Sequence, residues 1–161
     1  MTSPAGGSPE TPTRPSDAAD AALWDAVAVE HGVIYGYGIV SAHSTPDANT
    51  LVSDSLAGHR ELREEGIARL HDRKVTPPIP AIGYQLPFVV DDPTAAAKLA
   101  VRMEEDSAVA WRAVLEQATA VSDRELAVKA LTRAAVTAAT WRAQQGVAPT
   151  TVAFPGGSEN A

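Results

Sequence analysis

Four ionisable residues each interrupt an otherwise apolar helical face, and they carry the chemistry that this sequence offers. They are Glu30, His59, Glu104 and Arg133. Burying a lone charge is costly, so groups of this kind are expected to meet and compensate one another. Two carboxylates, an imidazole and a guanidinium at one point would form a buried charge cluster. Without the guanidinium, the same carboxylates and imidazole could instead bind a metal ion.

Each of these residues lies near the middle of a stripe of apolar residues. The stripes are Leu23, Val27, Ile34 and Tyr37 around Glu30; Val52, Leu56, Leu62 and Ile67 around His59; Val101, Ala108, Trp111 and Leu115 around Glu104; and Leu126, Ala130, Val136 or Thr137 and Trp141 around Arg133. Spacings of mostly three and four residues place each set on one side of a helix. The sequence therefore predicts four amphipathic helices that point these side chains inward.

Capping signals set the limits of these helices. The expected ranges are residues 16–43, 46–73, 92–119 and 122–145. The boundary residues are Ser16 or Asp17, Thr45 before Pro46, Asp92 before Pro93, Ser122 with Glu125 as a capping box, and Gly146 as a stop. Polar N-caps, Pro at the first helical position and a terminal Gly are the usual helix boundaries. Helices of such similar length are typical of a bundle.

The composition supports an all-α fold and excludes several function classes. Of 161 residues, 31 are Ala and only 5% are aromatic, which suits closely packed helices better than a sheet. The absence of Cys excludes disulfides, Cys-ligated metal and a thiol nucleophile. A net charge of −7 argues against a nucleic-acid partner. Without a long apolar run or a secretory leader, we expect no membrane partner and a cytoplasmic protein.

The connections between the helices predict the topology. Helices one and two, and helices three and four, are joined by a few residues and should form antiparallel hairpins. About 18 residues, TPPIPAIGYQLPFVVDDP, separate the hairpins; their prolines favour an extended path, and their apolar residues favour contact with the bundle. The predicted fold is an all-α, ferritin-like four-helix bundle with a long Pro-rich crossover between helices two and three. The expected organisation is a disordered arm (1–15), the bundle (16–146) and a flexible tail (147–161).

The two hairpins also resemble each other. An offset of 74 residues aligns Glu30 with Glu104, Tyr37 with Trp111, His59 with Arg133 and Ile67 with Trp141. Ala-rich helices match one another easily, so this register is one interpretation of the pattern. If it holds, Tyr37, Trp111 and Trp141 occupy equivalent inner positions of an internal repeat.

Three segments carry a resemblance to a known superfamily. They are EHGVIYGYG (30–38), AGHRELREEG around His59, and EEDSAVAWRAVLE (104–116). Through them the chain resembles the ferritin-like superfamily, and more closely an uncharacterised, Ala-rich actinobacterial family of that fold. The resemblance covers about residues 17–145 and implies the bundle, but no established activity.

Ferritin-like di-iron proteins use one Glu from each of two helices and a Glu-x-x-His from each of the other two. Glu30 and Glu104 match the single glutamates, and His59 matches one histidine, although Leu56 stands where its paired Glu should be. In the fourth helix Ala130 and Arg133 replace both ligands. We therefore expect a degenerate di-iron site that binds no cofactor. In this site Arg133 would neutralise both carboxylates. The Arg133→Ala substitution would then lower the free energy of unfolding by about 3–5 kcal/mol.

Two alternatives stay open for this centre. One is a single Fe or Mn, or Zn, held by Glu30, His59 and Glu104, with Arg133 turned away. The other is a helix rotation that points Glu105 or Asp106 inward in place of Glu104. His31 lies about 100° around the helix from Glu30, and we expect it to make a lateral hydrogen bond rather than to bind metal.

No catalytic residue stands out, because the sequence has no phosphate loop, dinucleotide motif or nucleophile elbow. The favoured function is a non-enzymatic, homodimeric scaffold or protein-binding module whose partner the sequence does not name. The alternatives are a metal-binding oxidoreductase that uses Glu30, His59 and Glu104, and a small-molecule binder with a pocket beneath the crossover. Gly32, Gly36 and Gly38 predict close approach of another helix, or of the crossover, to the first helix. The charged run 60–69 predicts a solvated face with pairs such as Glu65–Arg69.

Overall fold

The computed structural model describes residues 11–157, and within them the chain forms four α-helices and no strand. They are α1 (Ala18–His43), α2 (Asn49–Asp72), α3 (Pro93–Gln117) and α4 (Val121–Gln144), with a short 3-10 helix, η1 (Pro46–Ala48), before α2. The predicted all-α four-helix bundle is confirmed. None of these helices combines the length and hydrophobicity needed to cross a membrane.

Two of the predicted helix caps form and two do not. The carboxylate of Asp17 accepts hydrogen bonds from the backbone N–H groups of the first turn of α1, and Asp92 accepts one from Ala95 at 2.7 Å. Thr45 makes no side-chain cap, because η1 comes between it and α2. The Ser122 capping box is also wrong, because α4 begins one residue earlier and has Ala120 at its N-cap.

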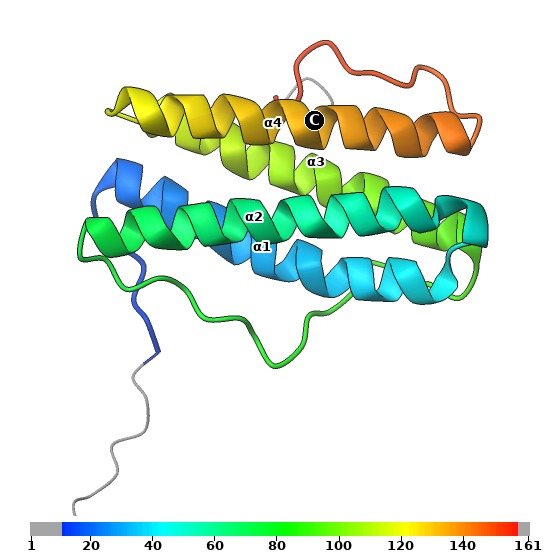
Figure 1. The fold of residues 1–161 in the computed structure, drawn as a ribbon, viewed down its shortest axis with the longest axis horizontal. Coiled ribbons are helices and arrows are strands. Elements are labelled where there is room, and N and C mark those ends of the chain that lie inside the picture. The colour runs from blue at the N-terminus through cyan, green and yellow to red at the C-terminus, as the bar shows by residue number, and fades with distance from the viewer. Residues whose placement is uncertain (1–10, 158–161) are drawn as a thin grey trace, which may run out of the picture.

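The helices form two antiparallel hairpins that lie side by side (Figure 1). α1 packs against α2 and α3, and α3 packs against α4. Residues 73–92 connect the hairpins by running the length of the bundle beside α1, as the green trace in Figure 1 shows. This crossover confirms the predicted connectivity, because α3 begins at the end of the bundle opposite to the end of α2.

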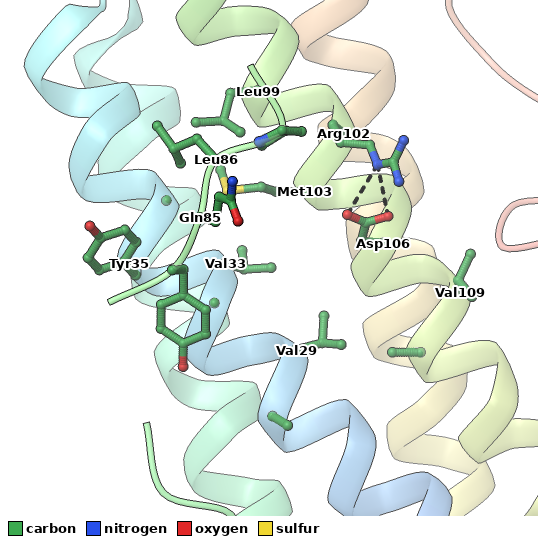
Figure 2. A pocket seen from close by; sticks show the side chains of 16 residues that line it. Val29, Val33, Tyr35, Gln85, Leu86, Leu99, Arg102, Met103, Asp106 and Val109 are labelled. Atoms are coloured by element: carbon green, nitrogen blue, oxygen red, sulfur yellow. Dashed lines mark hydrogen bonds and ion pairs between the residues drawn. The ribbon is translucent and has the colours of Figure 1, made fainter. Parts of the chain in front are cut away.

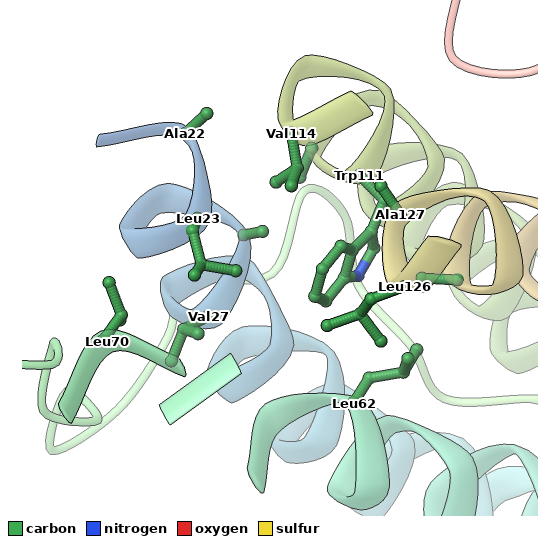
Figure 3. Close-up of a cluster of buried hydrophobic side chains, with 12 residues drawn as sticks. Ala22, Leu23, Val27, Leu62, Leu70, Trp111, Val114, Leu126 and Ala127 are labelled. Atoms are coloured by element: carbon green, nitrogen blue, oxygen red, sulfur yellow. The ribbon is translucent and has the colours of Figure 1, made fainter. Parts of the chain in front are cut away.

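The apolar core consists of two clusters, one toward each end of the bundle. The first includes Leu23, Val27, Leu62, Leu70, Trp111 and Leu126 (Figure 3). The second includes Tyr37, Val40, Val52, Leu99, Met103 and Trp141. On α1, α2 and α3, the predicted charged positions 30, 59 and 104 fall between the residues of the two clusters. The central polar side chains are therefore flanked by apolar packing toward each end of the bundle.

The described parts of both terminal segments contact the bundle. Residues 1–10 of the predicted N-terminal arm and residues 158–161 of the predicted tail lie outside the described residues. Arg14 pairs with Asp25 of α1 at 2.6 Å, and the backbone carbonyl of Thr150 accepts a hydrogen bond from Arg142 of α4 at 3.0 Å. Gly156 lies against the backbone of Ala108 on α3, where a Cβ atom would come within 2.5 Å of the carbonyl oxygen.

Candidate functional site

Three of the four predicted residues meet at the centre of the bundle. His59 on α2 lies between Glu30 on α1 and Glu104 on α3, with 2.6 Å from Nδ1 to Glu30 Oε2 and 3.0 Å from Nε2 to Glu104 Oε1. The three residues are 3%, 0% and 1% exposed, respectively. We call them the Glu–His–Glu cluster. In the structure, the lone polar residues of these three helices are thus in direct contact.

The Glu–His–Glu cluster fixes the ionisation of its histidine. A neutral imidazole has one donor and one acceptor nitrogen, whereas both ring nitrogens of His59 face carboxylate oxygens. Burial lowers the pKa of His59, but the hydrogen bonds to Glu104 and Glu30 and the charges of both carboxylates outweigh it and raise the pKa to about 10. His59 is therefore an imidazolium at neutral pH and donates to both carboxylates.

Glu30 is further hydrogen-bonded by two side chains of α3. Ser107 Oγ donates to Glu30 Oε1 at 2.9 Å, and Trp111 Nε1 donates to the same oxygen at 2.8 Å. Ser107 and Trp111 follow Glu104 by three and seven residues, so all three share one helical face. Ser107 was not predicted from the sequence, although this spacing was the signal that could have identified it.

Glu104 receives the matching hydrogen bond from α1. Tyr37 OH donates to Glu104 Oε1 at 2.5 Å, and Trp141 Nε1 of α4 donates to the Tyr37 oxygen at 3.1 Å. Burial, followed by the charge of Glu104 and the hydrogen bond to it, raises the pKa of Tyr37 well above its ordinary value. The phenol therefore keeps its proton and remains a donor to the carboxylate.

These contacts give the internal repeat a structural meaning. Glu30 is bonded by Trp111, and Glu104 is bonded by Tyr37. Adding 74 to Glu30 gives Glu104, and subtracting 74 from Trp111 gives Tyr37, so each contact maps onto the other. The two hairpins thus contribute equivalent glutamate–aromatic pairs across the α1–α3 contact. The symmetry ends at His59, whose counterpart by offset is Arg133.

Arg133 lies outside the Glu–His–Glu cluster, so its predicted place was wrong. Its side chain is 35% exposed and bonds Glu61 Oε2 at 3.4 Å and the backbone carbonyl of Asp54 at 3.1 Å. The guanidinium lies over Gly58 of α2, where a Cβ atom would come within 1.8 Å of the Arg133 Cζ. Glycine at this position gives the guanidinium space between α2 and α4.

The packing of α4 explains this error. Its buried face runs through Ala130, Ala134 and Ala138, rather than through Arg133. Small side chains let α4 lie close to α3, which leaves little room for a guanidinium between them. Because Ala residues occupy several faces of α4, apolar periodicity could not distinguish the two helix rotations.

Replacing Arg133 with Ala is therefore expected to lower the free energy of unfolding by less than about 1 kcal/mol, because partly exposed ion pairs contribute little. This expectation replaces the larger loss predicted for a buried guanidinium. Urea denaturation of the Arg133→Ala variant measures the change directly. A loss of 3 kcal/mol or more would instead indicate that Arg133 compensates buried charge.

The structure also selects among the neighbouring acidic residues of α3. Glu105 pairs with Arg142 of α4, and Asp106 pairs with Arg102 at 3.1 Å on the exposed side of α3. Glu104 is thus the acidic residue of this run that points to the centre. The helix rotation that would turn Glu105 or Asp106 inward is wrong.

His31 belongs to a different part of the molecule from the Glu–His–Glu cluster. Its Nε2 lies 3.2 Å from the backbone carbonyl of Pro78 in the crossover, so the predicted lateral hydrogen bond is confirmed. Burial is the main cause that lowers the pKa of His31. Trp24 Nε1 donates to the carbonyl of Thr76 at 3.2 Å, so two side chains of α1 bond the start of the crossover.

The charged run of α2 forms ion pairs across to α4. Glu65 pairs with Lys129 at 3.2 Å, and Arg69 pairs with Asp123 at 3.2 Å. The predicted Glu65–Arg69 pair within α2 is therefore wrong. Together with the Arg133–Glu61 contact, these pairs connect α2 and α4 along their length.

The Glu–His–Glu cluster does not fit a di-iron centre. Both nitrogens of His59, both oxygens of Glu30 and one oxygen of Glu104 are within hydrogen-bond distance of protein groups, which leaves only Glu104 Oε2 without a partner in the part of the chain described. No group of three or more His, Asp or Glu residues within 11–157 has an arrangement that could hold a metal ion. A metal ion would have to displace the protons that bridge His59 to both glutamates.

Comparisons with known proteins identify relatives but no activity. The crystal structure of a conserved hypothetical protein from Mycobacterium tuberculosis is 55% identical in sequence, with a TM-score of 0.79, and the match covers 86% of this chain and 97% of that one. No functionally curated protein matches the sequence. Residues 22–159 match the family described as Domain of unknown function (DUF4439). The chain therefore belongs to the DUF4439 family.

Proposed function

We propose that this protein is a ferritin-like bundle with a degenerate di-iron site that acts without catalysis, as a homodimeric scaffold or protein-binding module. The order of two hairpins and a long crossover supports the ferritin-like assignment. The substitutions at Leu56, Ala130 and Arg133 remove three of the six ligands of that centre. A bundle with this connectivity but without those ligands keeps the ferritin-like fold and loses the six-ligand di-iron site.

The observation that carries this proposal is the position of His59 between the two carboxylates. An imidazolium that donates to Glu30 and Glu104 takes the place that a cation would take in a metal site, because it compensates both negative charges. The other donors, Ser107, Trp111 and Tyr37, bond the same carboxylates. The charges are then compensated within the protein itself.

The outer face of α4 supports a role in protein binding. Val121, Val128 and Val136 are 63%, 48% and 61% exposed, respectively, and their spacing of seven and eight residues places them along one side of the helix. Apolar side chains that share one exposed face are candidates for contact with a second chain. We propose this face as the contact surface of the homodimer or of another protein partner.

A second candidate is a metal-binding oxidoreductase that uses Glu30, His59 and Glu104 to bind Fe or Mn. One observation favours it, since Glu104 Oε2 is buried without a hydrogen-bond partner among the described residues. That oxygen is a single potential ligand. The metal would need to replace the His59 protons to gain the others.

Elemental analysis of protein purified without a chelating tag separates the two candidates. We expect iron and manganese well below one ion per chain, and no difference between the natural protein and its Glu30→Ala variant. Light scattering on the same sample is expected to give the mass of two chains. Stoichiometric metal that is lost in Glu30→Ala would contradict the metal-free proposal, and the mass of one chain would contradict the dimer.

A further inference from the structure

A pocket lies between α1, α3 and the crossover, and its lining contains none of the residues of the Glu–His–Glu cluster. Its volume is about 580 Å³. Figure 2 shows side chains from all three segments around it, among them Val29, Val33, Leu86, Leu99, Met103 and Val109. This size falls within the range of small-molecule sites, which are mostly apolar with a few polar groups.

Two glycines of α1 contribute to the shape of this pocket. A Cβ atom at Gly36 would come within 2.1 Å of the Met103 sulfur, and one at Gly32 would come within 3.4 Å of the Tyr84 ring. Both neighbours line the pocket. The Met103 sulfur occupies the space that a side chain at position 36 would need, whereas a Cβ atom at position 32 would make an ordinary van der Waals contact with Tyr84. Of the three glycines singled out in the sequence, Gly36 therefore has a packing role within the chain.

The crossover wall of the pocket is held in place by specific contacts. The rings of Tyr84 and Tyr35 lie 5.3 Å apart between centroids, and Tyr84 OH accepts a hydrogen bond from the backbone N–H of Ala81 at 3.1 Å. The hydrogen bond between His31 and Pro78 anchors the same segment nearer to α2. The contacts of Tyr84 with Tyr35 and of Pro78 with His31 thus hold the crossover against α1, and walls that are already in place lower the cost of binding.

The charges around the pocket point to the class of ligand. Arg102 and Asp106 are the charged residues that line it, and they bond each other at 3.1 and 3.2 Å, as the dashed lines in Figure 2 show. Their charges cancel, so the rim attracts neither anions nor cations strongly. The amide of Gln85, also in the lining, offers both a donor and an acceptor.

We propose that this pocket binds a neutral, largely apolar small molecule, such as a hydrocarbon chain or fused ring with one uncharged hydrogen-bonding group. Burial of the apolar part would supply most of the affinity, and the group at its end would bond Gln85. An ionic head group would meet a pair of side chains, Arg102 and Asp106, whose opposite charges already compensate each other. This binding role goes beyond the proposed scaffold and does not depend on the Glu–His–Glu cluster.

Titration with the neutral dye N-phenyl-1-naphthylamine tests the proposal on the full chain. We expect saturable fluorescence with one site per chain. Val109→Trp, which fills the pocket from a position that is 53% exposed, should weaken binding by at least about tenfold. Val147→Trp, at a position that is 47% exposed and outside both the pocket lining and the contact face of α4, is the matched control and should leave binding unchanged. Arg102→Gln should weaken binding much less than Val109→Trp does, because the ligand carries no charge.

Several results would overturn this proposal. Absence of saturable binding, or equal loss in Val109→Trp and Val147→Trp, would show that the dye does not occupy this pocket. Tighter binding of an anionic naphthalene sulfonate dye that is lost in Arg102→Gln would reject the neutral ligand class. A dimer by light scattering that Val109→Trp converts to a monomer would show that a second copy of the chain covers the pocket. Ala28→Leu, which fills the pocket from α1, replaces Val109→Trp if circular dichroism shows that the latter is unfolded.

Discussion

Replacing His59 with Leu is expected to lower the free energy of unfolding by about 3–5 kcal/mol at neutral pH, because it leaves two buried carboxylates without their cation. Glu30 and Glu104 are 0% and 1% exposed, so water cannot solvate them in place of the imidazolium. Urea denaturation measures the loss. His71→Leu is the matched control, because His71 is exposed on the same helix and its replacement should change stability little.

A triple variant separates loss of charge compensation from loss of packing. In Glu30→Gln, His59→Leu, Glu104→Gln the carboxylates are neutral, while the amide oxygens can still accept hydrogen bonds from Ser107, Trp111 and Tyr37. We expect this variant to recover at least half of the stability lost in His59→Leu. Equal instability of the two variants would mean that the imidazole ring matters through its shape and not through its charge.

The stability of the protein is expected to fall as pH rises from about 7 to about 9.5, by roughly 1.4 kcal/mol per pH unit at most. The cause is His59, whose pKa is raised from the ordinary value of 6.5 to about 10. A group whose pKa is raised in the folded state gives its full stabilisation below its unfolded pKa. That stabilisation is lost as pH rises through the interval between 6.5 and about 10, where only the unfolded chain has released the proton.

Urea denaturation across this pH range measures the effect, and His59→Leu is the control that should lose the slope. The other shifted groups in the core act outside the window. The pKa of His31 is lowered, so its contribution changes below pH 6.5, and the pKa of Tyr37 is raised above an ordinary value of 10.0. A natural protein whose stability stays flat over this range would contradict an ionised His59.

The helices and their connectivity could be predicted because the residues that begin and end helices agree with the pattern of apolar residues along the chain. Asp17 and the Asp92–Pro93 step mark the starts of α1 and α3, and Gly146 follows α4 with a φ of 67°. The apolar and Pro-rich composition of the crossover predicted an extended segment along the bundle. In the structure, Trp24 and His31 of α1 form hydrogen bonds with the backbone of this crossover.

Most of the central site could also be predicted, because a charged residue in an apolar stripe is conspicuous. Glu30, His59 and Glu104 were identified in this way and meet in the structure. Arg133 could not be excluded, because Ala130, Ala134 and Ala138 offer α4 an equally apolar face next to it. The existence of a pocket beneath the crossover could be predicted, but its shape and volume could not. They depend on how Tyr84 and Met103 pack over the glycines of α1.

Nitrogen-15 NMR of the His59 side chain tests most directly whether an imidazolium occupies the centre of the bundle in place of a metal ion. At about pH 8, which lies between the pKa of free histidine and that of His59 in the fold, we expect both ring nitrogens of His59 to carry a proton. We also expect that adding Zn²⁺ leaves these signals unchanged. A neutral ring with one unprotonated nitrogen, or loss of a ring proton when Zn²⁺ is added, would contradict an imidazolium in this place.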